Sequence, residues 1–271
     1  MADRRLKLAI LCGDDAHHKY LISALSSNFD VAAVVIEPGS CQKKMMLKKK
    51  KIKRYMYSLY HSARRMICGL NSYRKKYFVN DFNENTSVQC MTLTINHINQ
   101  ETVIQLLNEC QPDLTVVMGT TILGKKLIEA CGRNIINIHG GYLPYYRGNH
   151  CFFFAMFNSE FDKIGSTIHF INTGIDTGDI IEVVKPLIEI RDTPEKLYCR
   201  AEMLAINRLI SMIKDYEEGI PFPRVPQNLK EGNLYRTEDR KLSHDLIFWF
   251  RRKTGRIVIP VKMACRVNNR F

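Results

Sequence analysis

The chain has 271 residues, 45% of them hydrophobic and 25% charged, which is the composition of a globular protein with a substantial core. No stretch approaches the roughly 20 consecutive apolar residues of a membrane-spanning helix, so an integral membrane protein is not expected. The net charge is +13, but thirteen Lys or Arg and no Asp or Glu lie within residues 43–76, and the other 27 basic residues equal the 27 acidic ones. The positive charge is therefore local, which weakens the case for a general nucleic-acid-binding protein.

The N-terminal region begins with an apolar run at residues 6–12. This run is short and Asp14 and Asp15 follow it at once, so it predicts a buried strand and not a signal peptide. The pattern then alternates between helix and strand. Helices are predicted at 17–27, 100–109, 124–131, 149–157 and 193–216, and strands at 31–36, 88–93, 113–118, 134–139, 165–171 and 179–186.

Strands that alternate with helices at this spacing predict βαβ units, and hence an α/β fold with a mainly parallel twisted sheet and helices on both faces. Ligands bind such sheets outside the carboxyl ends of the strands. The strand predicted at 134–139 carries polar Asn137 and His139 between isoleucines at its carboxyl end. Two glycines and the shaped loop LPYYRG follow, so this strand end is the candidate site.

Three features in this order carry a resemblance: Asn137-Ile138-His139, the Leu-Pro-x-x-x-Gly loop at 143–148, and the Gly-Ile-Asp-Thr-Gly-Asp turn at 174–179. Together they resemble the active-site signature of formyltransferases that use 10-formyltetrahydrofolate. That family includes methionyl-tRNA, glycinamide-ribonucleotide and amino-sugar N-formyltransferases. The resemblance covers about 6–216, is dense from 112 to 181, and implies the Rossmann-like formyltransferase fold.

The resemblance implies that Asn137, His139 and Asp176 are catalytic. An amine that attacks a formyl carbon creates an oxyanion, for which the Asn137 amide is a suitable donor. The His139 imidazole can move a proton at neutral pH, and Asp176 can orient or charge-stabilise it. A single Asn or His at a strand end is more often structural, but the three together with the loop favour catalysis. His150 and His169 are interpreted as structural or substrate-side histidines, and Asp179 as a turn residue.

The resemblance also implies how the formyl donor binds, through the backbone of the loop after strand 113–118 and of the loop before Asp176. The donor-binding residues expected on this basis are Met118, Gly119, Thr120, Thr121, Ile122, Leu123, Gly174 and Ile175. No glycine-rich dinucleotide fingerprint follows the first strand, so NAD is not expected. The nine cysteines are scattered without a CxxC pair, which predicts no metal site and a reducing cytoplasm.

The acceptor expected from the resemblance is the amine of a nucleotide-linked amino sugar in surface polysaccharide biosynthesis. About 55 residues follow the helix at 193–216, fewer than the C-terminal barrel of the tRNA enzymes needs, and they resemble the tail of bacterial amino-sugar enzymes. Asp14 and Asp15 would repel the phosphate of a purine substrate. Gly141-Tyr142 replaces a Ser-Leu of the tRNA enzymes. The expected substrate-side residues are Tyr142, Tyr146, Arg147, Tyr235 and Arg236. The alternatives are a methionyl-tRNA formyltransferase-like enzyme and a non-catalytic adaptor at a membrane surface.

The basic segment 42–78 is predicted to be an inserted amphipathic helix or helix pair, because apolar residues recur every three or four positions between lysines and arginines. Its main interpretation is a cap whose apolar face packs on the domain. Docking on an anionic membrane, helped by the aromatic-basic stretch 248–253, is the second. Attraction for an anionic sugar nucleotide or a folate polyglutamate tail is the third interpretation, and binding of nucleic acid is the last.

We therefore expect a catalytic domain at 1–217 that contains this insertion, and an extension at 218–271 that serves as a dimer interface or a substrate clamp. A homodimer is one of the assemblies considered. The expected location is the cytoplasm, with peripheral contact at the inner face of the membrane.

Overall fold

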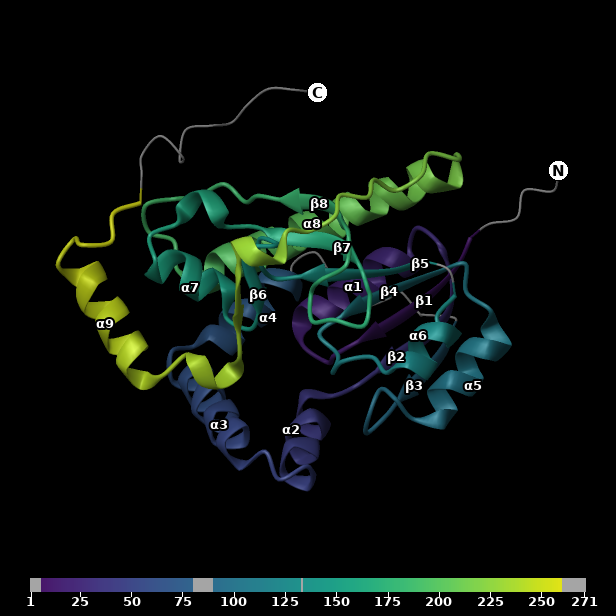
Figure 1. The fold of residues 1–271 in the computed structure, drawn as a ribbon, viewed down its shortest axis with the longest axis horizontal. Helices are drawn as coiled ribbons and strands as arrows, with labels where there is room; N and C mark the ends of the chain where they lie inside the picture. Colours follow the sequence, from purple (N-terminus) through teal and green to yellow (C-terminus); the bar gives the residue numbers. More distant parts are fainter. Residues whose placement is uncertain (1–5, 80–89, 133, 260–271) are drawn as a thin grey trace.

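The structure, a computed structural model, describes residues 6–79, 90–132 and 134–259, and it is built around a seven-stranded sheet (Figure 1). The strand order is β3-β2-β1-β4-β5-β7-β8. The strands are β1 (Lys7–Cys12), β2 (Asp30–Ile36), β3 (Met91–Thr94), β4 (Leu114–Met118), β5 (Asn134–His139), β7 (Ser166–Phe170) and β8 (Ile180–Val184). The pairs from β3 to β5 are parallel, whereas β7 and β8 are added antiparallel. The predicted mainly parallel sheet is confirmed. The start of the strand predicted at 88–93 lies outside the described residues.

Helices cover both faces of the sheet, as predicted. They are α1 (Ala16–Ser26), α5 (Glu101–Cys110), α6 (Lys125–Ala130), α7 (Cys151–Phe157) and α8 (Pro194–Glu217). Successive residues of a strand point to opposite faces. Ile10 of β1 accordingly packs with α1 and α8, and the next residue, Leu11, packs with α5 and α6.

The sheet reverses its winding between β1 and β4, and this is where an open α/β sheet offers a crevice for a ligand. The two strand ends are joined by a hydrogen bond from the Gly13 amide to the Met118 carbonyl, at 3.1 Å. The strand that carries Asn137 and His139 is the next neighbour of β4. The fold therefore brings three strand ends to one edge.

The basic insertion forms three helices, α2 (Gly39–Lys48), α3 (Ile52–Ile67) and α4 (Leu70–Val79), so the prediction of one helix or a pair was wrong. Lys50 (φ 53°) and Gly69 (φ 66°) take left-handed backbone conformations that interrupt the helical run. Arg74 ties α4 to the domain through Glu195 of α8 at 2.7 Å.

The prediction that the apolar face of this segment packs on the domain is wrong for α3, which turns its apolar face to solvent. Met66 is 70% and Ile67 79% exposed, whereas Ser58 and His61 are buried. The cause is the polarity of what α3 meets, namely η3 (Thr237–Asp239) and α9 (Leu242–Lys253). Three polar contacts hold it there: Arg54 pairs with Glu238 at 3.2 Å, the Tyr60 hydroxyl donates to Asp245 at 2.7 Å, and His61 Nε2 bonds the Thr237 carbonyl at 3.1 Å.

The C-terminal segment returns to the sheet edge. β9 (Asn233–Tyr235) pairs in parallel with β6 (Tyr146–Gly148), which follows the candidate catalytic strand. Two short 3₁₀ turns, η1 (Phe161–Lys163) and η2 (Leu229–Glu231), complete the described elements. None of the helices in the described ranges is both long and apolar enough to span a membrane.

Glu37, just after β2, is fully buried and joins two loops at the candidate site. Its carboxylate accepts hydrogen bonds from the Ile98 amide at 2.9 Å, the Thr121 amide at 2.6 Å and the Thr121 hydroxyl at 2.9 Å. The loop after β4 is thus held by a side chain from the neighbouring half of the sheet.

We predict that Glu37→Ala lowers the free energy of unfolding by about 2–4 kcal/mol, because two amides lose a charged acceptor. Urea denaturation followed by circular dichroism measures it. The matched control is Glu129→Ala, which removes only an exposed pair with Lys125 and should cost less than about 1 kcal/mol. Equal losses in the two variants would contradict this account of the loop.

Candidate active site

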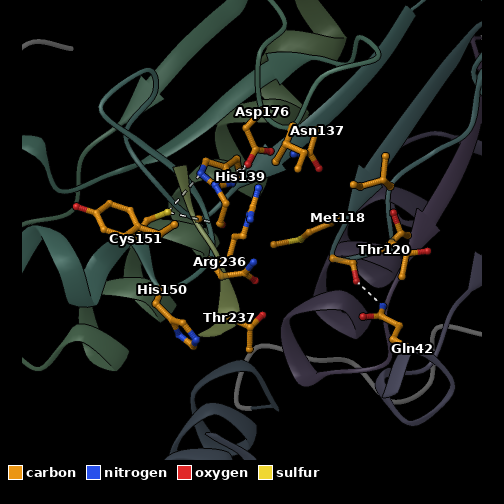
Figure 2. A pocket seen from close by; sticks show the side chains of 18 of the residues that line it. Gln42, Met118, Thr120, Asn137, His139, His150, Cys151, Asp176, Arg236 and Thr237 are labelled. Atoms are coloured by element: carbon orange, nitrogen blue, oxygen red, sulfur yellow. Dashed lines mark hydrogen bonds and ion pairs between the residues drawn. The ribbon is translucent and has the colours of Figure 1, made fainter. Parts of the chain in front are cut away.

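A cavity of about 680 Å³ opens at the carboxyl ends of β4 and β5 (Figure 2). Its wall is formed by the loop after β4, the end of β5, the loop 171–176, the insertion α2–α4 and the segment 234–240. Cavities of this size suit a small molecule or a cofactor, with a few polar groups to orient it.

Asn137, His139 and Asp176 meet in this cavity (Figure 2). Asn137 and His139 are two residues apart on β5, so their side chains leave the same face of the strand. Asp176 arrives from the loop between β7 and β8, and its Oδ2 lies 3.5 Å from His139 Nδ1. The candidate residues are distant in sequence and adjacent in space.

The tautomer of His139 is fixed by its backbone partner. His139 Nε2 lies 3.0 Å from the Tyr146 carbonyl, which can only accept, so Nε2 carries the hydrogen. The basic nitrogen is therefore Nδ1, the one that faces Asp176. Glycine is required beside it, because a Cβ on Gly141 would lie 2.5 Å from His139 Nε2 and 2.6 Å from the Tyr146 carbonyl.

His169 on β7 orients the Asn137 side chain. Its Nδ1 donates to the Phe170 carbonyl at 2.8 Å, and its Nε2 accepts from Asn137 Nδ2 at 3.0 Å. Burial, together with the charge of His139, lowers the pKa of His169 to about 4 against the opposing effect of Asp176. A neutral His169 can accept this bond, and the Asn137 amide is held as a donor.

Asp176 is fixed from two directions. Its Oδ2 accepts a hydrogen bond from the Gly148 amide at 2.8 Å, and Gln227 donates to its carbonyl at 3.2 Å. Its backbone is left-handed (φ 51°), a conformation that is uncommon outside glycine and that clusters at functional sites.

All the residues expected to bind the formyl donor line the cavity: Met118, Gly119, Thr120, Thr121, Ile122, Leu123, Gly174 and Ile175. The Gln42 amide, which also lines the cavity, donates to the Gly119 carbonyl at 2.9 Å and holds this loop (Figure 2). Ile122 and Ile175 are apolar yet 63% and 39% exposed in the wall, where a flat aromatic ligand can cover them.

The expected substrate-side residues divide into two groups. Tyr235 and Arg236 line the cavity, whereas Tyr142, Tyr146 and Arg147 are not among the described residues of its wall. Tyr146 is a core side chain whose hydroxyl bonds Glu160 and Asn158, and only its carbonyl reaches the site. The Tyr142 ring packs under Lys185, 4.7 Å from Nζ.

The cavity also holds residues that sequence reasoning missed. Glu202 of α8 is buried, accepts from Ser166 at 2.8 Å, and burial raises its pKa to about 8. Cys151 Sγ lies 3.6 Å from His139 Nε2. In the sequence both look like ordinary helix residues, so no signal distinguished them. Arg54, Arg64 and Arg65 of α3 also line the cavity. The spacing of the basic residues in this segment is a sequence signal that could have identified them.

No set of three or more His, Cys, Asp or Glu within the described ranges is arranged to hold a metal ion. The cysteines that the structure describes are all free.

A family model described as formyl transferase matches residues 9–213. The methionyl-tRNA formyltransferase of Desulforamulus reducens is 34% identical over 162 residues, covering 60% of this chain and 49% of that protein. The chain thus spans about half the length of the curated relatives it matches.

Solved structures share the fold. A sugar N-formyltransferase from a Shewanella species superimposes with a TM-score of 0.56 at 18% identity, covering 91% of this chain and 87% of that one. A sugar 3N-formyl transferase, WlaRD, was solved with dTDP and 5-N-formyl-THF. It superimposes with a TM-score of 0.53 at 18% identity, covering 88% of this chain and 72% of that one.

We predict that His169 stays neutral down to a pH of about 4. An unfolded histidine binds its proton near pH ~6.5, so folding stability should fall as the pH drops from about 6.5 towards 4, by up to about 3 kcal/mol for this group. Histidine-resolved NMR titration, assigned with His169→Gln, measures the pKa, and urea denaturation from pH 7 to 4.5 measures the stability. A His169 titration near 6.5 would contradict the geometry.

Proposed function

The chain belongs to the formyl transferase family, and from that premise we propose that it moves a formyl group from 10-formyltetrahydrofolate to the amine of a nucleotide-linked amino sugar. The family supports formyl transfer itself. The observation that carries the proposal is the meeting of Asn137, His139 and Asp176 in a cavity that Tyr235 and Arg236 also line.

The three polar residues have distinct roles. The Asn137 amide, oriented by His169, donates to the formyl oxygen as negative charge develops there, and one such donor is worth about 3–4 kcal/mol in comparable sites. His139 Nδ1 takes the proton that the attacking amine must lose. The Asp176 carboxylate, 3.5 Å away, stabilises the imidazolium that results.

The donor site is proposed along the loop 118–123. The loop is fixed by hydrogen bonds to Glu37, Gln42 and Asn99, and the Asn99 amide donates to the Ile122 carbonyl at 2.9 Å. Its exposed Ile122, with Ile175 from the second loop, fits the flat pterin of a folate. Bound there, the folate would supply an activated formyl group on nitrogen.

The sugar acceptor is supported by the shared fold of sugar N-formyltransferases, one of them solved with dTDP. Methionyl-tRNA is the second candidate, supported by the names of the relatives of similar sequence. The cavity and its arginines suit a compact anionic substrate, and we therefore rank the sugar first. A product of this kind serves surface polysaccharide assembly, and we propose that the enzyme acts in the cytoplasm.

We predict that the protein releases tetrahydrofolate when it is mixed with 10-formyltetrahydrofolate and one member of a panel of dTDP-, UDP- and GDP-linked amino sugars. His139→Ala should lower kcat by about 10²–10⁴-fold because the general base is gone. The change in absorbance on deformylation measures it. Lys163→Ala, outside the cavity wall, is the control and should keep the activity.

Three outcomes would redirect the proposal. Turnover with initiator methionyl-tRNA and with no sugar would assign the second candidate. Normal turnover by His139→Ala would contradict the catalytic assignment. Folate binding without turnover on any acceptor would favour the non-catalytic adaptor.

We also propose that the outer face of α3 contacts an anionic membrane. Its exposed apolar residues Ile52, Met56, Leu59, Met66 and Ile67 lie at helical spacing, and the exposed Lys48, Lys50 and Lys53, which are outside the cavity wall, are close to them in the chain. Exposed Trp249 and basic Arg251 to Lys253 on α9 extend the same chemistry on a neighbouring helix. An apolar stripe flanked by lysines is complementary to an anionic bilayer surface.

We predict that the protein sediments with phosphatidylglycerol vesicles and much less with phosphatidylcholine vesicles. The triple variant Met56→Ser/Met66→Ser/Ile67→Ser should lose this retention at least fivefold. A control with three exposed apolar residues elsewhere, Ile190→Ser/Leu204→Ser/Ile220→Ser, should keep it. Equal retention by all three proteins, or a homodimer that only the first variant disrupts, would overturn the membrane proposal.

A further inference from the structure

The inner face of α3 is basic and turned towards the cavity. Arg54, His61 and Arg65 recur at helical spacing on the face opposite the apolar stripe, and Arg64 lies at its edge. Arg54, Arg64 and Arg65 all line the cavity that contains His139. A helix inserted between β2 and β3 thus contributes cationic side chains to the candidate active site.

These side chains gather around His150. The His61 and His150 rings lie 4.2 Å apart, between centroids. Burial, and then the neighbouring His61, Arg240, Arg64 and Arg65, hold the pKa of His150 well below its ordinary value, and burial lowers the pKa of His61 to about 4. The two imidazoles are therefore neutral near pH 7, and the positive charge of the cluster is carried by its guanidinium groups.

Only part of this charge is neutralised by the protein. Arg240 pairs with Asp245, and Arg54 with Glu238. Among the described residues no carboxylate forms an ion pair with Arg64, Arg65 or Arg236. A site with repelling cations and few counter-charges attracts an anion.

Buried polar atoms in the cluster also lack partners. Arg64 Nε, His61 Nδ1 and His150 Nε2 are buried and form no hydrogen bond within the described structure. His61 is 2% exposed, so its orphan nitrogen cannot be satisfied by bulk solvent. Buried polar groups are normally hydrogen-bonded, and three exceptions at one spot favour a binding site for a polar group.

We propose that His61, Arg64 and Arg65, together with His150 and Arg240, form the subsite that binds the phosphate of the acceptor substrate. This inference rests on the proposed function. Guanidinium groups fit phosphate oxygens with paired hydrogen bonds, which a neutral sugar could not use.

The position of the cluster separates it from the donor loop. Figure 2 shows His150, Thr237 and Arg236 on the left of the view and Thr120 and Gln42 on the right, with Met118 between them. His150 lies two residues after Gly148, the last residue of β6, whose amide donates to Asp176. An anion held at His150 thus lies near the catalytic residues and away from the proposed donor loop 118–123. A folate glutamate tail is therefore a less suitable occupant than the phosphate of the acceptor.

The test is a calorimetric titration of the protein with dTDP and with inorganic pyrophosphate. We expect the double variant Arg64→Gln/Arg65→Gln to bind dTDP and pyrophosphate at least tenfold more weakly. The same variant should raise the KM for the amino sugar at least tenfold, with little change in kcat. Lys48→Gln/Lys53→Gln removes the same charge from the same segment outside the cavity wall and should change affinity less than twofold. Binding of 5-formyltetrahydrofolate should be equal in all three proteins and reports on the fold and the donor site.

Each outcome decides the subsite independently of turnover. The subsite is overturned if Arg64→Gln/Arg65→Gln keeps its affinity for dTDP and pyrophosphate, or if Lys48→Gln/Lys53→Gln loses as much of that affinity. Loss of the 5-formyltetrahydrofolate affinity would assign the arginines to the donor. If initiator tRNA inhibits turnover of the amino sugar while neither dTDP nor pyrophosphate does, the phosphate subsite is overturned in favour of a nucleic-acid contact. If dTDP binds as expected while no amino sugar is formylated, the subsite stands and the proposed acceptor fails.

Discussion

The carboxylate of Asp176 holds the candidate site together. It accepts the Gly148 amide at 2.8 Å, faces His139 Nδ1 at 3.5 Å, and lies 3.8 Å from His169 Nε2. One group thus links the loop after β7, the end of β5 and the end of β6, where Gly148 lies. Its left-handed backbone is tolerated because Gln227 and the surrounding loops hold it. Proton transfer by His139 depends on this carboxylate, since a buried imidazolium needs a counter-charge.

The insertion α2–α4 places a basic helix face against the candidate site. Helix α3 turns its basic side inward to the cavity and its apolar side outward to solvent, the reverse of a helix that covers a core. The reversal is stable because Arg54, Tyr60 and His61 find polar partners on the C-terminal segment. One helix can therefore serve an anionic substrate on one face and a lipid surface on the other. Both proposals follow from the same inversion.

The sequence alone sufficed for the sheet and for most helix boundaries, because periodicity is a local signal. The Asn-x-His, Leu-Pro and Asp-Thr-Gly-Asp motifs, through the family resemblance, sufficed to pick out the loop 118–123 that lines the cavity. The sequence did not suffice for α3, whose amphipathic pattern is the same whichever face is buried; the orientation is decided by Glu238 and Asp245, nearly two hundred residues away. Tyr146 was placed at the substrate for a related reason, since the parallel pairing of β6 with β9 turns it into the core. The raised pKa of Glu202 depends wholly on burial, which no spacing reveals.

The most direct test of the central claim is a crystal structure with 5-formyltetrahydrofolate, an unreactive relative of the proposed donor. The account predicts the pterin against the backbone of 118–123 and Ile122, with the formyl oxygen about 2.7–3.1 Å from Asn137 Nδ2 and the formyl carbon beside His139. A folate bound with its formyl group away from Asn137 and His139, or along the basic face of α3, would contradict it.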